Sequence, residues 1–63
     1  MREILYPVGT LVRFRVGQGE LYAIVIKSEI SWRGHSDHDV FIPSTGATSY
    51  GWKGAELFEV KAP

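Results

Sequence analysis

The sequence contains no cysteine and no asparagine, and its seven basic side chains balance seven acidic ones. Without cysteine the chain has no disulfide framework and no thiolate metal site, so we expect a protein of a reducing compartment, the cytoplasm. The zero net charge removes the general attraction to polyanions that basic proteins have. The longest apolar run, Leu21 to Ile26, is far too short to cross a bilayer, and Met1-Arg2-Glu3 is not typical of a signal peptide. We therefore expect no membrane association.

The chain has 63 residues, which is enough for one small domain spanning residues 1–63. A domain of this size buries only about 60% of the surface of its unfolded chain and is marginally stable on its own. Two tryptophans, three tyrosines and three phenylalanines are available to fill a core or to contact a partner. The sequence therefore predicts either an unusually apolar core or association with another subunit.

The hydrophobic pattern has a period of two, which is typical of half-buried strands. Val12, Phe14 and Val16 alternate with two arginines, and a Gly-Gln-Gly turn then leads into a second strand that is apolar on both faces. The polar stretch 28–38 is expected to be a connection around Trp32. The predicted strands span residues 12–16, 20–29, 38–42, 47–53 and 58–61, with a single 3₁₀ turn over 54–57. The predicted core comprises Phe14, Ile24, Ile26, Val40, Ile42, Leu57 and Val60.

The order of these features resembles an SH3-like barrel, as found in Tudor-like and KOW-like domains and in many small tailed-phage proteins. The resemblance rests on Val8-Gly9-Thr10-Leu11-Val12, on Ala23-Ile24-Val25, and on the closing run Trp52 to Val60. It covers about residues 7–61 and consists mainly of positions that build the fold. It implies an all-β domain, a single five-stranded antiparallel SH3-like barrel with one 3₁₀ turn before the last strand. Such barrels serve many functions, so the resemblance assigns none.

Surplus apolar side chains favour a protein-interaction surface. The second strand is apolar on both faces, and one small barrel cannot bury all eight aromatic rings. Aromatic residues and arginine are enriched at the energetic centres of interfaces. We therefore expect a non-catalytic protein-interaction module that binds a protein partner, most simply a second copy of itself. Its predicted contact residues are Tyr22, Trp32, Arg33, Phe41, Tyr50 and Trp52.

Two other binding functions are compatible with the sequence. Basic side chains interleaved with aromatic rings are typical of single-strand nucleic-acid binding, and the candidates are Arg13, Arg15, Lys27 and Lys53. Alternatively, an aromatic cage for a methylated lysine or arginine needs several rings that converge beside a carboxylate. Tyr50, Trp52 and Phe41 with Asp39 are the candidates for such a cage.

Catalytic and metal-binding signals are weak. The chain has no cysteine nucleophile, no G-x-S-x-G motif and no recognisable base beside its serines, so we expect neither enzymatic activity nor a cofactor. The densest group of ligating side chains is His35, Asp37, His38 and Asp39, which are of types that bind Zn²⁺ or Mn²⁺. The favoured interpretation of this stretch is a solvated polar loop, with metal binding as the alternative.

Overall fold

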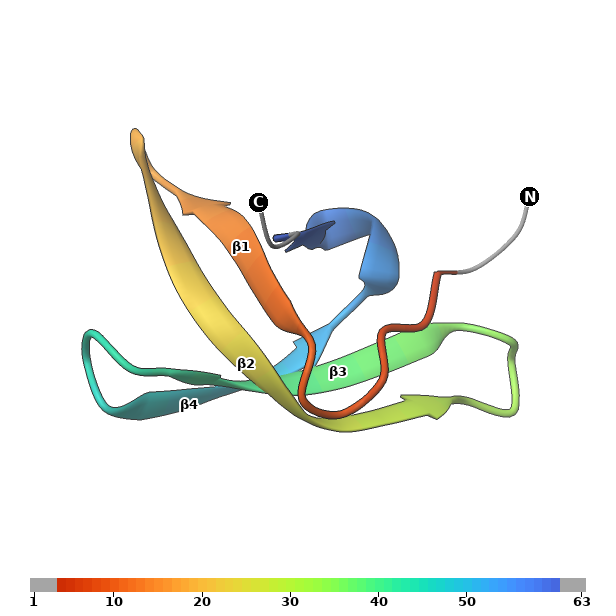
Figure 1. Ribbon diagram of the computed structural model, residues 1–63. Helices are drawn as coiled ribbons and strands as arrows, with labels where there is room; N and C mark the ends of the chain where they lie inside the picture. The colour runs from red at the N-terminus through yellow and green to blue at the C-terminus, as the bar shows by residue number, and fades with distance from the viewer. Residues whose placement is uncertain (1–3, 61–63) are drawn as a thin grey trace.

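The computed structural model describes residues 4–60 and shows five strands in one antiparallel sheet (Figure 1). The sheet order is β4-β3-β2-β1-β5, so β4 and β5 are its two edges. A single 3₁₀ turn, η1, precedes the last strand, as the sequence predicts. The all-β class is therefore confirmed. The elements are β1 (Leu11–Val16), β2 (Gly19–Ile30), β3 (Ser36–Ile42), β4 (Ala47–Trp52), η1 (Gly54–Glu56) and β5 (Phe58–Glu59).

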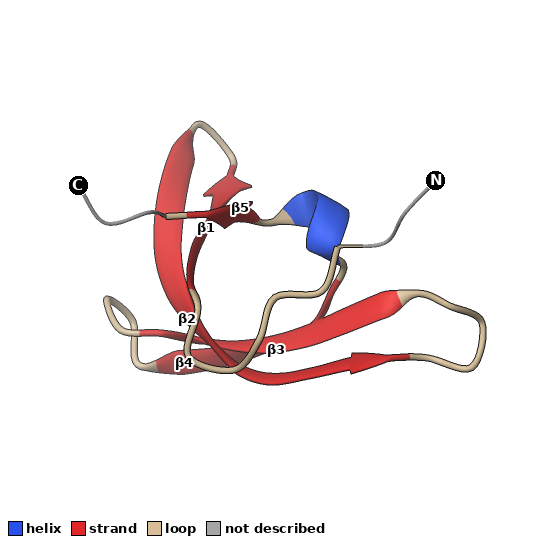
Figure 2. Cartoon of the chain, turned by 45° about the vertical axis from the view of Figure 1, so that its right-hand side comes forward, coloured by secondary structure: helices blue, strands red, loops and turns tan. Residues whose placement is uncertain are grey.

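The bend of β2 gives the molecule its shape (Figures 1 and 2). The first half of β2 pairs with β1, from Gly19 opposite Val16 to Ile24 opposite Leu11. Its second half pairs with β3, and the register shifts between Val25 and Lys27. Because a bulge increases local twist and bends a strand, this shift lets one long strand belong to two differently oriented hairpins.

The core lies on the concave side of this bend. The ring of Phe14 packs against Trp52 from β4, with 4.4 Å between the ring centroids. Tyr6 and Leu21, both partly buried, pack against the edge of the same cluster. The buried hydrophobic residues of the core are Val12, Phe14, Ala23, Val25, Val40, Ile42 and Leu57.

The predicted assignment of β2 to the core was wrong by one residue. Ile24 and Ile26 are 37% and 46% exposed, whereas Ala23 and Val25 are completely buried. Every side chain from Leu21 to Ile26 is apolar, so the sequence offers no alternation from which to choose the inward face. The other predicted core positions are buried, except that Val60 is only partly so.

The stretch 28–38 is also not the polar connection that was expected. β2 continues to Ile30, β3 already begins at Ser36, and only residues 31–35 form the loop. Ser36 and His38 are fully buried, whereas Asp37 between them remains partly exposed. The polar residues therefore follow strand alternation, and β2 and β3 extend as a hairpin beyond the rest of the sheet (Figure 1).

The buried imidazole of His38 joins two distant parts of the backbone. Its Nε2 accepts a hydrogen bond of 2.9 Å from the Tyr6 N–H, and its Nδ1 lies 2.9 Å from the Trp52 carbonyl oxygen. Because an N–H can only donate and a carbonyl can only accept, the ring carries its proton on Nδ1. His38 therefore connects the N-terminal segment, residues 4–10, to the end of β4.

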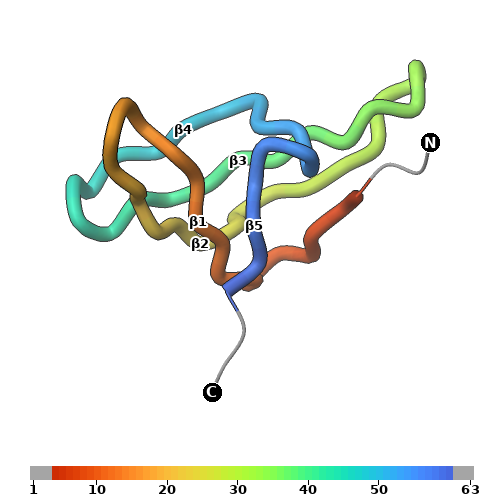
Figure 3. The backbone as a smooth tube through the Cα atoms, turned by 90° about the horizontal axis from the view of Figure 1, so that it is seen from above, coloured from red at the N-terminus to blue at the C-terminus, as the bar shows by residue number. Residues whose placement is uncertain are grey.

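The N-terminal segment first passes close to η1 and then runs beside β2 before β1 begins (Figures 2 and 3). The Gly9 N–H donates to the Val25 carbonyl over 2.8 Å, and the Val25 N–H donates to the Thr10 carbonyl over 3.0 Å. At the other end, a Cβ placed on Gly54 would lie only 1.9 Å from the carbonyl oxygen of Ile4. The segment is thus held along its length, and its close approach to η1 requires a glycine there.

Candidate protein-interaction surface

The convex side of the sheet carries a continuous group of exposed apolar side chains, which we call the outer face. Leu11, Ile24 and Phe41 are paired neighbours on β1, β2 and β3. Tyr22, on β2, lies two residues before Ile24, and Phe58 extends the group onto β5. These five side chains are between 37% and 55% exposed. Contiguous apolar area on the surface of a small domain marks a contact site.

Arg13 lies between two aromatic members of this group, Tyr22 and Phe58. It lies opposite Tyr22 on β2 and opposite Phe58 on β5. Its guanidinium lies over the Phe58 ring, 5.1 Å from the centroid, and forms an ion pair with Glu20. The arginine stem therefore covers apolar surface while its charge remains paired, as is common for amphipathic side chains.

The outer face carries opposite charges at its two ends. The end formed by the β1–β2 hairpin carries two arginines, Arg13 and Arg15, and one carboxylate, Glu20. The end formed by the β2–β3 hairpin has three carboxylates against one lysine. There Lys27 pairs with Asp39, and Glu29 lies opposite Asp37. The face is therefore basic at one end, apolar in the middle and acidic at the other end.

The tip of the β2–β3 hairpin presents Trp32 and Arg33. They occupy the central positions of a β-turn in which the Gly34 N–H donates to the Ser31 carbonyl over 2.8 Å. The Ser31 N–H also donates to the His35 carbonyl over 2.7 Å, which closes the loop. The indole of Trp32 is 88% exposed, and the Arg33 guanidinium lies 4.7 Å from its ring centroid. A closed turn thus projects an almost fully exposed tryptophan.

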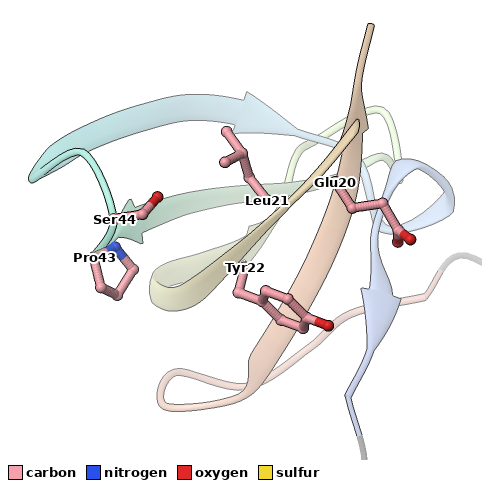
Figure 4. Close-up of a pocket in the computed structure, with 5 residues that line it drawn as sticks. All are labelled: Glu20, Leu21, Tyr22, Pro43 and Ser44. Atoms are coloured by element: carbon pink, nitrogen blue, oxygen red, sulfur yellow. The ribbon is translucent and has the colours of Figure 1, made fainter. Parts of the chain in front are cut away.

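A pocket of about 300 Å³ lies where β2 separates from the end of β3 (Figure 4). β2 pairs with β3 only from Ile24 onward, so the preceding residues of β2 stand apart from the β3–β4 turn. The pocket wall is mainly apolar, with Glu20 as its charged member. Its lining residues are Glu20, Leu21, Tyr22, Pro43 and Ser44.

The six predicted contact residues lie in separate places. Tyr22 and Phe41 belong to the outer face, and Trp32 with Arg33 form the hairpin tip. Tyr50 is 73% exposed on the edge strand β4. Trp52 is only half-buried but packs on the core, and its Nε1–H donates to Ser49 Oγ over 2.8 Å.

The candidate aromatic cage is not assembled by the fold. Phe41 pairs with Thr48 on the outer face, whereas Trp52 pairs with the buried His38 on the core side. Their rings therefore point to opposite sides of the sheet. Asp39 accepts a hydrogen bond from the Gly51 N–H over 3.3 Å and so supports the irregular pairing of β3 with β4.

The candidate nucleic-acid residues do not form a basic patch. Arg13 is paired with Glu20, which also lies opposite Arg15. Lys27 lies opposite Asp39 on β3. Lys53 is exposed beside η1, where its backbone N–H donates to the Glu56 carboxylate over 2.9 Å. Each strand cation therefore has an acidic neighbour, which weakens the field that would attract a phosphate backbone.

The fold does not bring the four metal-binding candidates together. Both ring nitrogens of His38 are engaged in the interior, whereas Asp37 and Asp39 lie on the opposite face of β3. His35 is exposed in the hairpin loop. Within residues 4–60, no three His, Asp or Glu side chains are grouped so that they could hold a metal ion. These residues are close together in the sequence, but strand alternation separates them in the structure.

Sequence reasoning missed three members of the outer face and the pocket beside it. Ile24 was assigned to the core, and Leu11 and Phe58 were not considered as contact residues. The pairing of alternate positions 11 and 13 with 24 and 22 follows once the Gly-Gln-Gly turn is placed at 17–19. A register argument from that turn identifies the outer face, whereas the pocket depends on where β2 leaves β3.

In the part of the chain that the structure describes, no helix is long and apolar enough to span a membrane. No family model matches the chain, and neither the curated proteins nor the solved structures contain a match to it.

Proposed function

We propose that this chain is a non-catalytic protein-interaction module that associates with a second copy of itself through the outer face. The observation that carries the proposal is the continuous row of exposed apolar side chains around Ile24, built from four neighbouring strands. Exposed area of this kind is stabilised when another protein removes it from water. Arg13 and Tyr22 supply the residue types that are enriched at interface hot spots.

The distribution of charge supports a second copy as the partner. A copy turned end for end places the arginine-rich end of one outer face near the carboxylate-rich end of the other. Opposite charges then meet at both ends of the contact, which is the self-complementarity that a two-fold symmetric interface needs. The balanced charge of the whole chain, seven basic and seven acidic side chains, keeps repulsion between identical copies small.

We also infer that the bent sheet is that of an SH3-like barrel. The antiparallel order β4-β3-β2-β1-β5, the division of β2 between two hairpins and the 3₁₀ turn before β5 support this assignment. The absence of cysteine supports a cytoplasmic location. Function still rests on the outer face, because this fold serves many functions.

Replacing Phe41 by serine is expected to weaken self-association at least about tenfold, because it removes an aromatic ring from the middle of the outer face. Phe41 is 37% exposed and lies outside the buried core, so the variant is expected to remain folded. Sedimentation equilibrium over a roughly hundredfold concentration range, up to about 1 mM, measures the dissociation constant.

The matched control is Val16→Ser. Val16 is 50% exposed but belongs to the opposite face of β1, so this variant should associate as the original chain does. A monomeric mass for the unmodified chain at every concentration would contradict self-association. Salt-sensitive binding of a single-stranded oligonucleotide that is lost in Arg13→Ala plus Arg15→Ala would instead favour the nucleic-acid function.

A further inference from the structure

We propose that the hairpin tip of one copy inserts Trp32 into the pocket of a second copy, with Arg33 placed against Glu20 at the pocket wall. This inference rests on the proposed self-association and names a specific contact within it. It joins an exposed indole on the tip of the β2–β3 hairpin to an apolar pocket beside the β3–β4 turn. This tip and this turn lie at opposite sides of the molecule (Figure 1).

The tip is built to present a side chain to a partner. Trp32 is 88% exposed, and Ile30, beside it at the end of β2, is 49% exposed. The turn that carries Trp32 is closed by two hydrogen bonds, from the Gly34 N–H to the Ser31 carbonyl and from the Ser31 N–H to the His35 carbonyl. Gly34 has a φ of 81°, which suits the turn and favours glycine. A preorganised loop loses little conformational entropy on binding, so a partner can use most of the indole surface.

The pocket fits an aromatic ring in size and chemistry. Its volume is about 300 Å³, whereas a cavity of roughly 150 Å³ already holds benzene. Leu21, Tyr22 and Pro43 give the pocket its apolar lining, with Leu21 and Tyr22 reaching it from opposite sides of β2 (Figure 4). Tyr22 is also part of the outer face, so the pocket is continuous with the surface proposed to hold two copies together.

The charges of the tip and the pocket are complementary, because the tip carries Arg33 and the pocket lining includes Glu20. Arg33 stacks on Trp32 and enters any contact together with it. Glu20 lines the pocket and already pairs with Arg13, and a carboxylate has two oxygens that can accept from two guanidinium groups. An indole followed by an arginine therefore meets an apolar pocket with a carboxylate at its rim, on the side of β2 away from Pro43 and Ser44 (Figure 4).

A chain cannot fill its own pocket with its own tip. The seven residues of β3 separate the tip from Pro43, a distance of about 20 Å along an extended strand. In the end-for-end pair suggested by the charges of the outer face, each tip lies beside the pocket of the other copy. Two equivalent contacts then form at once, so the assembly closes as a dimer.

The first test separates the tip from the outer face. Trp32→Ala is expected to raise the dissociation constant at least about thirtyfold, which is the loss typical of an interface hot spot. Ser44→Tyr places a ring in the pocket from an exposed turn and should have the same effect. In the unmodified chain, the indole N–H resonance of Trp32 should shift with concentration, whereas that of Trp52 should not.

Mixing the two variants provides the decisive complementation experiment. Trp32→Ala keeps an open pocket, and Ser44→Tyr keeps an intact tip, so one tip-in-pocket contact forms only when the two are combined. A Trp32 resonance of labelled Ser44→Tyr that moves on titration with Trp32→Ala supports the proposal. The same titration with Ser44→Tyr as the added partner should leave it unmoved.

The possible failures are distinguishable. If Trp32→Ala and Ser44→Tyr associate as tightly as the unmodified chain while Phe41→Ser does not, the tip contact is wrong and the proposed function stands. If the unmodified chain stays monomeric up to about 1 mM, both are wrong. An Arg33→Glu defect that Glu20→Arg fails to repair would overturn the pairing of those two residues.

Discussion

His38→Ala is expected to remove a large part of the domain's free energy of unfolding. The substitution removes the ring that binds the Tyr6 N–H and the Trp52 carbonyl, so both backbone groups lose their hydrogen bond, and it leaves a cavity at a position with no solvent exposure. Unsatisfied buried polar groups and a cavity together cost roughly 3–5 kcal/mol. At about 0.05–0.15 kcal/mol per residue, a domain of this length has a total stability of about 3–9 kcal/mol. Urea denaturation followed by circular dichroism measures the loss.

His35→Ala is the matched control for this experiment. His35 lies on the same hairpin but is exposed in the loop, so its replacement should change the free energy of unfolding by less than about 1 kcal/mol. Equal denaturation midpoints for the two variants would show that the His38 ring does not hold the N-terminal segment. In the intact protein, ¹⁵N spectra should find the ring proton of His38 on Nδ1, the tautomer that both hydrogen bonds require.

Gly54→Ala is expected to destabilise the protein by roughly 1–3 kcal/mol, the usual cost of forcing an extra methyl group into a packed site. The new Cβ would lie 1.9 Å from the Ile4 carbonyl oxygen and 2.8 Å from its carbon, so the N-terminal segment must move away from η1. The φ of Gly54 is not positive, so the cause is steric contact and not backbone strain. Thermal denaturation measures the size of the effect.

Gly19→Ala provides the control because it adds the same methyl group in open space. The nearest atom to its Cβ is the Val16 carbonyl oxygen at 3.9 Å, and its φ is also not positive. Such a substitution is neutral or stabilising by up to about 1 kcal/mol. Displacement of the segment by Gly54→Ala should also accelerate hydrogen exchange at the Tyr6 amide. Unchanged exchange there, with unchanged stability, would refute the close approach of Ile4 to Gly54.

The strands that alternate clearly could be predicted from the sequence. In β1, Val12 and Phe14 alternate with arginines, and both are buried as expected. In β3, Val40 and Ile42 are buried while Phe41 between them is exposed, also as expected. In these segments hydrophobicity changes at every residue, so the pattern itself identifies the inward face.

The inward face of β2 and the burial of polar residues in β3 could not be predicted, because the local hydrophobic pattern does not determine them. In β2 the apolar run has no alternation, and its inward face is set by its pairing with β1, in which Ala23 lies opposite the buried Val12. In β3, Ser36 and His38 are polar yet buried, because their hydrogen-bond partners come from Gly54, Tyr6 and Trp52. Because these partners are distant in the sequence, the polarity of neighbouring residues does not predict that Ser36 and His38 are buried.

The presence of an exposed apolar surface could be predicted from the sequence, but the residues that share it could not. Surplus apolar residues correctly indicate an exposed apolar area, since Tyr22, Trp32 and Phe41 are all exposed. Which of them share a surface depends on strand register, which places Tyr22 and Phe41 around Ile24 and leaves Trp32 at a distant tip.

The way in which the N-terminal segment is held also sets an order of events in folding. Tyr6 is bound by a residue 32 positions further along the chain, and Ile4 contacts one still more distant. A ribosome makes this segment before the strands that receive it, and contacts between such distant residues form slowly because a long loop must first be closed. We therefore expect the part of residues 4–60 that is synthesised first to be among the last to reach its final position.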